Sequence, residues 1–122
     1  MADAGAPRAS GTLAAHYAPK TPLTLVEDAA LLIELARSLT KQGRKVAALA
    51  LSEAQPVLDG VTWVAAPREA GRYAHALYAN LRALDDAGCD AILVEKPPQT
   101  PEWAAINDRL ARAAASAVDE AT

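Results

Sequence analysis

The chain has 122 residues, 52% of them hydrophobic and 22% charged, which suffices for one domain around one continuous core. Its formal net charge of -3 supplies no positive field, so autonomous binding to a nucleic acid is disfavoured. The single cysteine, Cys89, excludes an internal disulfide and a cysteine-cluster metal site, and it fits a reducing cytoplasm. No apolar run is long enough to cross a bilayer and residues 1–15 lack a signal-peptide pattern, so we expect a cytoplasmic chain without a membrane partner.

The first half of the chain predicts a flexible arm, a strand, a helix and a second strand. Residues 1–20 are expected to form the arm, because small residues, Gly and Pro dominate its start. A strand follows at 21–27, and Asp28 caps a helix that ends near Gly43, a residue suited to the left-handed conformation. Its apolar positions have helical spacing: Leu31, Leu32, Leu35, Ala36 and Leu39. The second strand, 45–52, is continuously apolar, which is typical of a strand covered on both faces.

The second half predicts two more strands and two more helices. The strands are at 61–67 and 91–97, and a long helix lies between them at 69–87. The last helix is expected to begin at Thr100-Pro101-Glu102, with the threonine hydroxyl as its cap. The inward positions of the two helices are Ala70, Ala74, Leu77, Leu81 and Leu84, and then Trp103, Ile106, Leu110 and Ala114.

Alternation of apolar strands with amphipathic helices predicts an α/β fold. We expect a three-layer Rossmann-like sandwich over residues 21–118, with about four mostly parallel strands and helices on both faces. If the strands are numbered along the chain, the most economical order is 3-2-1-4.

In such a sheet, ligands bind beyond the carboxyl ends of the strands. The candidate contacts there are Ser52, Arg68 and Glu95, and Arg109 on the last helix is a further candidate for gripping a carboxylate or phosphate. Glu95 ends an apolar strand, where a carboxylate needs a reason to lie; the alternative is that it pairs with Lys96 or a helix N-terminus. Arg109 has the alternative of simply facing solvent.

The chain shows no complete catalytic site. It has neither G-x-G-x-x-G after the first strand nor G-x-x-x-x-G-K-[ST], so we expect this domain itself to bind no cofactor. His75 reads as a solvated residue and Cys89 as a buried, inert thiol, and no set of ligands predicts a metal. A nucleophile, a base and an orienting group cannot be assembled.

The segment His16-Tyr17-Ala18-Pro19-Lys20 stands out from the arm. It places a histidine beside a tyrosine in an extended stretch framed by prolines. Either this segment acts on a partner, or it anchors the arm on its own domain.

Three ordered stretches resemble one family, the two-domain threonylcarbamoyl-AMP synthases. SGTLAAHYAPKTPLTLV (10–26) is similar to the interdomain linker and first strand of their C-terminal domain. YAHALYANLRALDDAGCDAILVE (73–95) and AINDRLARAA (105–114) are similar to its later helices and final strand. The chain departs from the family pattern where Thr100-Pro101-Glu102-Trp103 replaces Gly-Leu-Gly, and where Asp108 replaces Asn.

The resemblance implies an accessory or regulatory domain of an enzyme that joins threonine, bicarbonate and ATP into threonylcarbamoyl-AMP for tRNA modification. It implies a YrdC-like catalytic domain as partner, in the same chain or a separate one, with ATP and a divalent cation bound there and tRNA involved only indirectly. The linker residues His16, Tyr17, Pro19 and Lys20 then form a lid over that domain. The alternative is a free-standing module that binds a small molecule or nucleotide.

Overall fold

The computed structural model describes residues 19–51 and 58–121, and from residue 116 onward only the backbone. Four strands form one parallel sheet: β2 (Leu23–Val26), β3 (Val46–Ala50), β4 (Val61–Ala65) and β5 (Ala91–Glu95). Three α-helices accompany them: α2 (Ala29–Lys41), α3 (Ala70–Asp86) and α4 (Ala104–Ala121), the last preceded by the 3-10 turn η1 (Pro101–Trp103). The predicted α/β class is confirmed.

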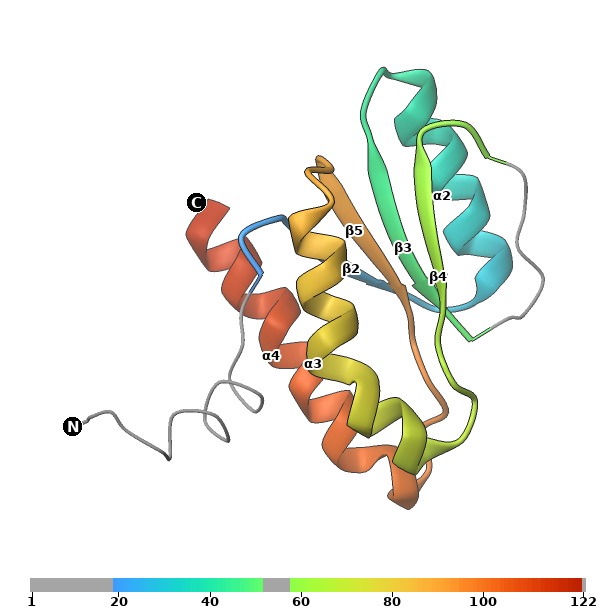
Figure 1. Cartoon of the computed structure of the whole chain (residues 1–122), viewed down its shortest axis with the longest axis vertical. Coiled ribbons are helices and arrows are strands. Elements are labelled where there is room, and N and C mark those ends of the chain that lie inside the picture. Colours follow the sequence, from blue (N-terminus) through green and yellow to red (C-terminus); the bar gives the residue numbers. More distant parts are fainter. Residues whose placement is uncertain (1–18, 52–57, 122) are drawn as a thin grey trace.

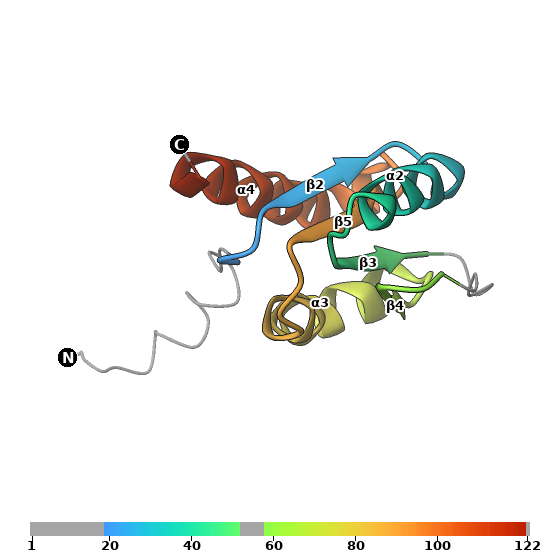
Figure 2. The same ribbon diagram turned by 90° about the horizontal axis from the view of Figure 1, so that it is seen from above.

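The strands lie in the order β2-β5-β3-β4, which Figure 2 shows from above. The predicted order 3-2-1-4 is therefore wrong, because the last strand inserts between the first and the second. The burial of the strands gives the physical reason. Residues 91–94 of β5 are all buried and suit an interior position, whereas β2 exposes Thr24 and leaves Leu25 half-buried, which suits an edge.

Two hydrophobic cores make the three layers. Helix α2 covers one face of the sheet, and α3 and α4 cover the other (Figure 1). Leu32 and Ala36 of α2 pack on Val46, Ala48 and Leu93. On the opposite face the sheet contributes Ala47, Leu49, Ile92 and Val94 to a larger core with the helices. No helix in the described residues has the length and apolar character to cross a membrane.

The ends of the helices show which of the predicted capping residues form a cap in the structure. Asp28 caps α2 as predicted, with its Oδ1 accepting the backbone N–H of Leu31 at 2.8 Å. Gly43 has a φ of 82°, the left-handed conformation predicted after that helix. Thr100, in contrast, forms no side-chain cap hydrogen bond, so its predicted role is wrong. The backbone N–H of Trp103 instead donates to the Thr100 carbonyl oxygen, closing the 3-10 turn.

The predicted inward stripes of α3 and α4 are confirmed, since all of their residues belong to the larger core or pack on it. The stripe of α2 is correct except at Leu31, which is 40% exposed. Tyr73 was not predicted to face inward, yet it is among the largest fully buried side chains.

Candidate functional site

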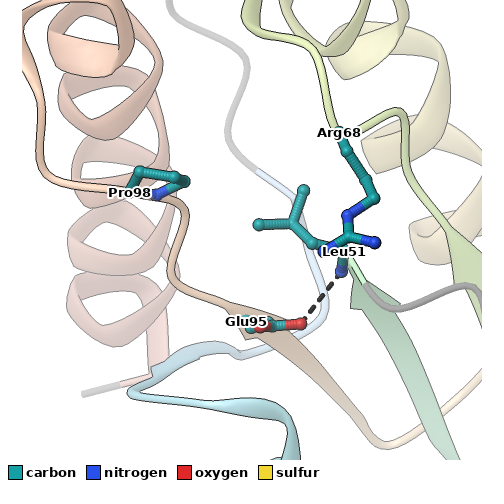
Figure 3. Close-up of a pocket in the computed structure, with 4 residues that line it drawn as sticks. All are labelled: Leu51, Arg68, Glu95 and Pro98. Atoms are coloured by element: carbon teal, nitrogen blue, oxygen red, sulfur yellow. Dashed lines mark hydrogen bonds between the residues drawn. The ribbon is translucent and has the colours of Figure 1, made fainter.

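A pocket of about 320 Å³ opens at the carboxyl ends of the two central strands. Leu51 follows β3, Glu95 ends β5, Arg68 lies in the loop between β4 and α3, and Pro98 precedes η1 (Figure 3). The connections diverge here, since β3 leads outward to β4 and β5 leads to α4 on one face of the sheet. This is the edge at which open parallel sheets bind ligands.

Glu95 is held in the pocket by the backbone. Its Oε1 accepts the N–H of Leu51 at 2.9 Å, the bond drawn as a dashed line in Figure 3. The alternative in which Lys96 neutralises Glu95 is wrong, because the Lys96 Nζ lies 2.6 Å from Glu27 Oε2. The two side chains diverge because neighbouring residues of a strand point to opposite faces of the sheet. The Glu95 carboxylate is therefore left to face the pocket.

Arg68 supplies the opposite charge. Its side chain extends from its loop toward the region of Leu51 and Glu95 (Figure 3), and it is exposed at the pocket rim. Within residues 19–51 and 58–121, the guanidinium of Arg68 belongs to no ion pair. The pocket thus contains a cation and an anion that are not paired with each other.

Tyr73, in the first turn of α3, is buried and lies within range of the Glu95 charge without lining the pocket. Its ring packs edge-on against Trp103, with centroids 5.2 Å apart and planes at 74°. The Tyr73 hydroxyl is buried and has no hydrogen-bond partner in the described structure. The residue as a whole is 1% exposed. Burial, and secondarily the negative charge of Glu95, raise the pKa of Tyr73, so the phenol stays protonated. No sequence motif marks this residue; only its helical register relative to Ala70 and Leu77 signals an inward position.

The loop that carries Pro98 is tied to α4 by side-chain amides. Asn107 Nδ2 donates to the carbonyl oxygens of Pro98 at 3.0 Å and Trp103 at 3.1 Å. Gln99 Nε2 donates to Asn107 Oδ1 at 3.1 Å and to the carbonyl oxygen of Pro97 at 2.8 Å. These bonds fix the backbone of Pro97 and Pro98 at the pocket wall and tie it to the end of η1 at Trp103.

The remaining crevice candidates do not join this group. Arg109 is half-buried on α4 and is not among the described residues that line the pocket. Ser52 lies outside the described residues. Of the four predicted crevice contacts, the structure brings together Arg68 and Glu95.

The end of the predicted lid segment is anchored on the domain. Pro19 is buried, and the exposed Lys20 donates its backbone N–H to Asp85 Oδ2 at 3.1 Å. Thr21 donates its N–H and its hydroxyl to Asp85 Oδ1 at 2.9 and 2.7 Å. Asp85, which lies inside the predicted helix 69–87, therefore fixes the start of β2. His16 and Tyr17 lie outside the described residues.

The other reactive side chains lie apart from this pocket. Cys89 is half-buried rather than fully buried, and it lines a separate pocket with Lys45 and Gly60. His75 is exposed on α3. Among the described residues, no three His, Cys, Asp or Glu side chains are grouped so as to hold a metal ion.

Comparisons with known proteins found one matching family model and similar solved structures. The family model described as "Threonylcarbamoyl-AMP synthase, C-terminal domain" matches residues 1–115. The crystal structure of P. abyssi Sua5 complexed with L-threonine is similar over 84% of this chain, with 25% identity and a TM-score of 0.67. A P. abyssi Sua5 variant, with a histidine and the following tyrosine changed to alanine, shares the fold over 81% of the chain and 29% of its own, at 23% identity and a TM-score of 0.68.

The match to the first of these structures covers 30% of its chain, so the present chain spans less than a third of that protein. No curated protein sequence matches the chain. The family model covers nearly the whole chain, and the structural matches agree with it. The chain therefore belongs to the family of threonylcarbamoyl-AMP synthase C-terminal domains.

Proposed function

We propose that this chain is the accessory, regulatory domain of an enzyme that makes threonylcarbamoyl-AMP from threonine, bicarbonate and ATP. The product is the donor for threonylcarbamoyladenosine in tRNA, so we expect the enzyme to work in the cytoplasm and to involve tRNA only indirectly. Family membership supports this proposal. The chemistry, of the nucleotidyltransferase type, belongs to a YrdC-like catalytic domain in the same chain or a separate one.

ATP and its divalent cation belong to that catalytic domain. The pocket of this chain does not suit a nucleotide, because the Glu95 carboxylate faces it and would repel phosphates. No glycine-rich loop follows β2 to offer backbone N–H groups to a phosphate; Glu27 and Asp28 occupy that turn.

We propose further that His16, Tyr17, Pro19 and Lys20 form a lid over the catalytic pocket. The observation that carries this proposal is the anchoring of the segment at its C-terminal end. Three hydrogen bonds to Asp85 give Lys20 and Thr21 one fixed position, so the residues before Pro19 start from a defined pivot. A proline-stiffened lid that excludes water would protect the labile mixed anhydride of the product.

The experiment compares variants of the chain fused behind a YrdC-like catalytic domain. We expect Tyr17→Ala to lower the yield of threonylcarbamoyl-AMP per ATP consumed by roughly tenfold or more, because water enters an uncovered site. Asp85→Asn should give a smaller loss, because the weakened anchor lets the lid pivot. Asp86→Asn is the matched control: it removes the neighbouring exposed acid and leaves the anchor intact.

Distinct results would contradict each part. An unchanged product yield in Tyr17→Ala would refute the lid. If Tyr17→Ala lowers the product yield as expected but Asp85→Asn leaves it unchanged, only the proposed role of the anchor is refuted. A catalytic domain that gives the same yield with and without this chain would refute the accessory role.

A further inference from the structure

Two charged side chains line the pocket at the ends of β3 and β5, and a third polar group, the Tyr73 hydroxyl, is buried within range of the Glu95 charge. The Glu95 carboxylate accepts one backbone hydrogen bond, from Leu51, and has no cationic partner among the described ion pairs. Arg68 lines the same pocket without a carboxylate partner in the described residues. The Tyr73 hydroxyl is buried and unpaired. Arg68 is exposed to solvent, but the half-buried Glu95 carboxylate keeps acceptor sites beyond its one hydrogen bond, and a ligand in the pocket can use them.

The positions of Arg68 and Glu95 link them to one ligand site. Arg68 and Glu95 enter from loops or strand ends on either side of β3 and face the same space (Figure 3). Tyr73 belongs to the helix that follows Arg68, and its phenol senses the charge of Glu95. Arg68 and Glu95 therefore border one small volume, with a cation on one side and an anion on the other, while Tyr73 is buried within range of the Glu95 charge but does not line the pocket.

The charges select the class of ligand. A phosphate or simple carboxylate would be attracted by Arg68 but repelled by Glu95, and a simple amine would have the opposite conflict. A small zwitterion satisfies both groups. The pocket volume of about 320 Å³ is at the lower end of small-molecule sites, which suits an amino acid better than a dinucleotide.

We propose that this pocket binds a free amino acid, whose carboxylate pairs with Arg68 and whose ammonium group donates to Glu95. The Leu51 N–H holds the Glu95 carboxylate in place for this contact. Pro98 closes the wall opposite Arg68 as the site is drawn in Figure 3, and Asn107 fixes the backbone of that wall.

The test is an NMR titration of the isotope-labelled 122-residue chain with L-alanine and, separately, with L-threonine. We expect saturable shifts of the Leu51, Arg68 and Glu95 amide signals by at least one of the two amino acids. N-acetyl-L-alanine, which lacks the ammonium group, and L-alanine methyl ester, which lacks the carboxylate, should bind at least tenfold more weakly than L-alanine if L-alanine binds. The corresponding threonine derivatives serve if L-threonine binds.

Variants assign the contacts. Glu95→Gln and Arg68→Leu should each weaken binding about tenfold or more, because each removes a charged hydrogen bond. Tyr73→Phe should leave affinity unchanged, because the Tyr73 hydroxyl is buried and does not line the pocket, and the ring still packs on Trp103. The controls are Glu102→Gln and Arg72→Leu, which remove exposed charges of the same sign outside the pocket lining and should leave affinity unchanged.

Three results would overturn the proposal. The first is the absence of saturable shifts up to about 50 mM of either amino acid. Binding weaker than this does not require the specific contacts that we propose. The second is binding that persists in both Arg68→Leu and Glu95→Gln. The third is preferential binding of AMP or inorganic phosphate with an affinity that Glu95→Gln does not change. The chain is tested without a catalytic domain, so the outcome is independent of the lid and its anchor.

Discussion

The hydroxyl of Tyr73 is a single atom that costs the unliganded fold free energy. It is desolvated in the core formed with α3 and α4 and receives no hydrogen bond in return. A buried hydroxyl without a partner costs about 1–3 kcal/mol, whereas the aromatic ring of the same residue stabilises that core through Trp103. Tyrosine at this position is therefore worse than phenylalanine for stability alone.

We predict that Tyr73→Phe raises the free energy of unfolding by about 1 kcal/mol, because it removes only the unsatisfied hydroxyl. Chemical denaturation of the isolated chain measures this. Tyr78→Phe is the control, since Tyr78 is half-buried and stacks its ring under Arg82 with 5.8 Å from the guanidinium carbon to the ring centroid. A loss of stability in Tyr73→Phe would mean that the hydroxyl has a partner after all.

The same variant should change the response of stability to alkaline pH. Burial raises the pKa of Tyr73 in the folded state, so the folded protein keeps the phenol proton that the unfolded chain loses above its ordinary pKa of about 10. The stabilisation from this group is complete below pH 10 and declines above it. The advantage of Tyr73→Phe over the parent should therefore grow by about 1.4 kcal/mol for each pH unit above 10. An equal alkaline slope in the two proteins would contradict the assigned cause.

At the residue scale, the sequence revealed the groups whose position follows from strand ends. Arg68 and Glu95 were predicted because parallel strands gather their carboxyl ends at one edge. Tyr73 and Asp85 were missed for another reason. Their partners, Trp103 and Thr21, lie 30 and 64 residues away along the chain, and no local pattern encodes such a contact. Asp85 lies inside the predicted helix 69–87, but its structural role depends on where β2 enters the sheet.

Among the elements, the connection from β5 to α4 shows how a loop is held without the glycines that the family pattern has there. Asn107 and Gln99 bond the carbonyl oxygens of Pro97, Pro98 and Trp103 with amide donors. Prolines can occupy this turn because the backbone contributes only acceptors to these hydrogen bonds. Proline keeps its carbonyl oxygen although it has no N–H.

We predict that Asn107→Ala lowers the free energy of unfolding by about 1–2 kcal/mol, because three hydrogen bonds are lost at once. Asp108→Ala is the neighbouring control. It breaks only the exposed ion pair with Arg112, 3.1 Å long, and should cost at most about 0.5 kcal/mol. Thermal unfolding of the two variants makes the comparison. Equal costs would show that the amide bonds do not hold the loop.

Local signals fixed the type of each element but not their arrangement. Asp28 and Gly43 marked the two ends of α2 correctly because capping is a property of neighbouring residues. The strand order was wrong because the apolar strands at 21–27 and 91–97 can each pair with the strand at 45–52, and no local signal decides which of the two lies at the edge. The more complete burial of β5 than of β2 becomes visible once the sheet is assembled.

At the scale of the whole molecule, the position of β5 makes the sheet depend on its last strand. The only strand that β2 contacts in the described sheet is β5, and β5 also pairs with β3. Without β5, the backbone groups of β2 would lose their partners, and the sheet faces of both cores would lose Ile92, Leu93 and Val94.

We predict that a chain ending after Ala87 shows no cooperative thermal unfolding, because β2 then has no partner strand and both cores are incomplete. A chain ending after Ala115 should unfold cooperatively, since it retains the buried α4 residues through Ala113. Circular dichroism during heating distinguishes the two. A cooperative transition in the shorter chain would mean that the sheet can close in another strand order.

The contact between Thr21 and Asp85 also sets an order of events during synthesis. The ribosome makes Thr21 first and reaches Asp85 64 positions later, which takes roughly 3–13 s at ordinary elongation rates. The strand partner of β2 emerges later still. During that interval the hydrogen bonds between Thr21 and Asp85 cannot form, so Lys20 and Thr21 have no fixed position on the domain. The anchor can therefore form only after α3 has been made, when most of the domain has left the ribosome.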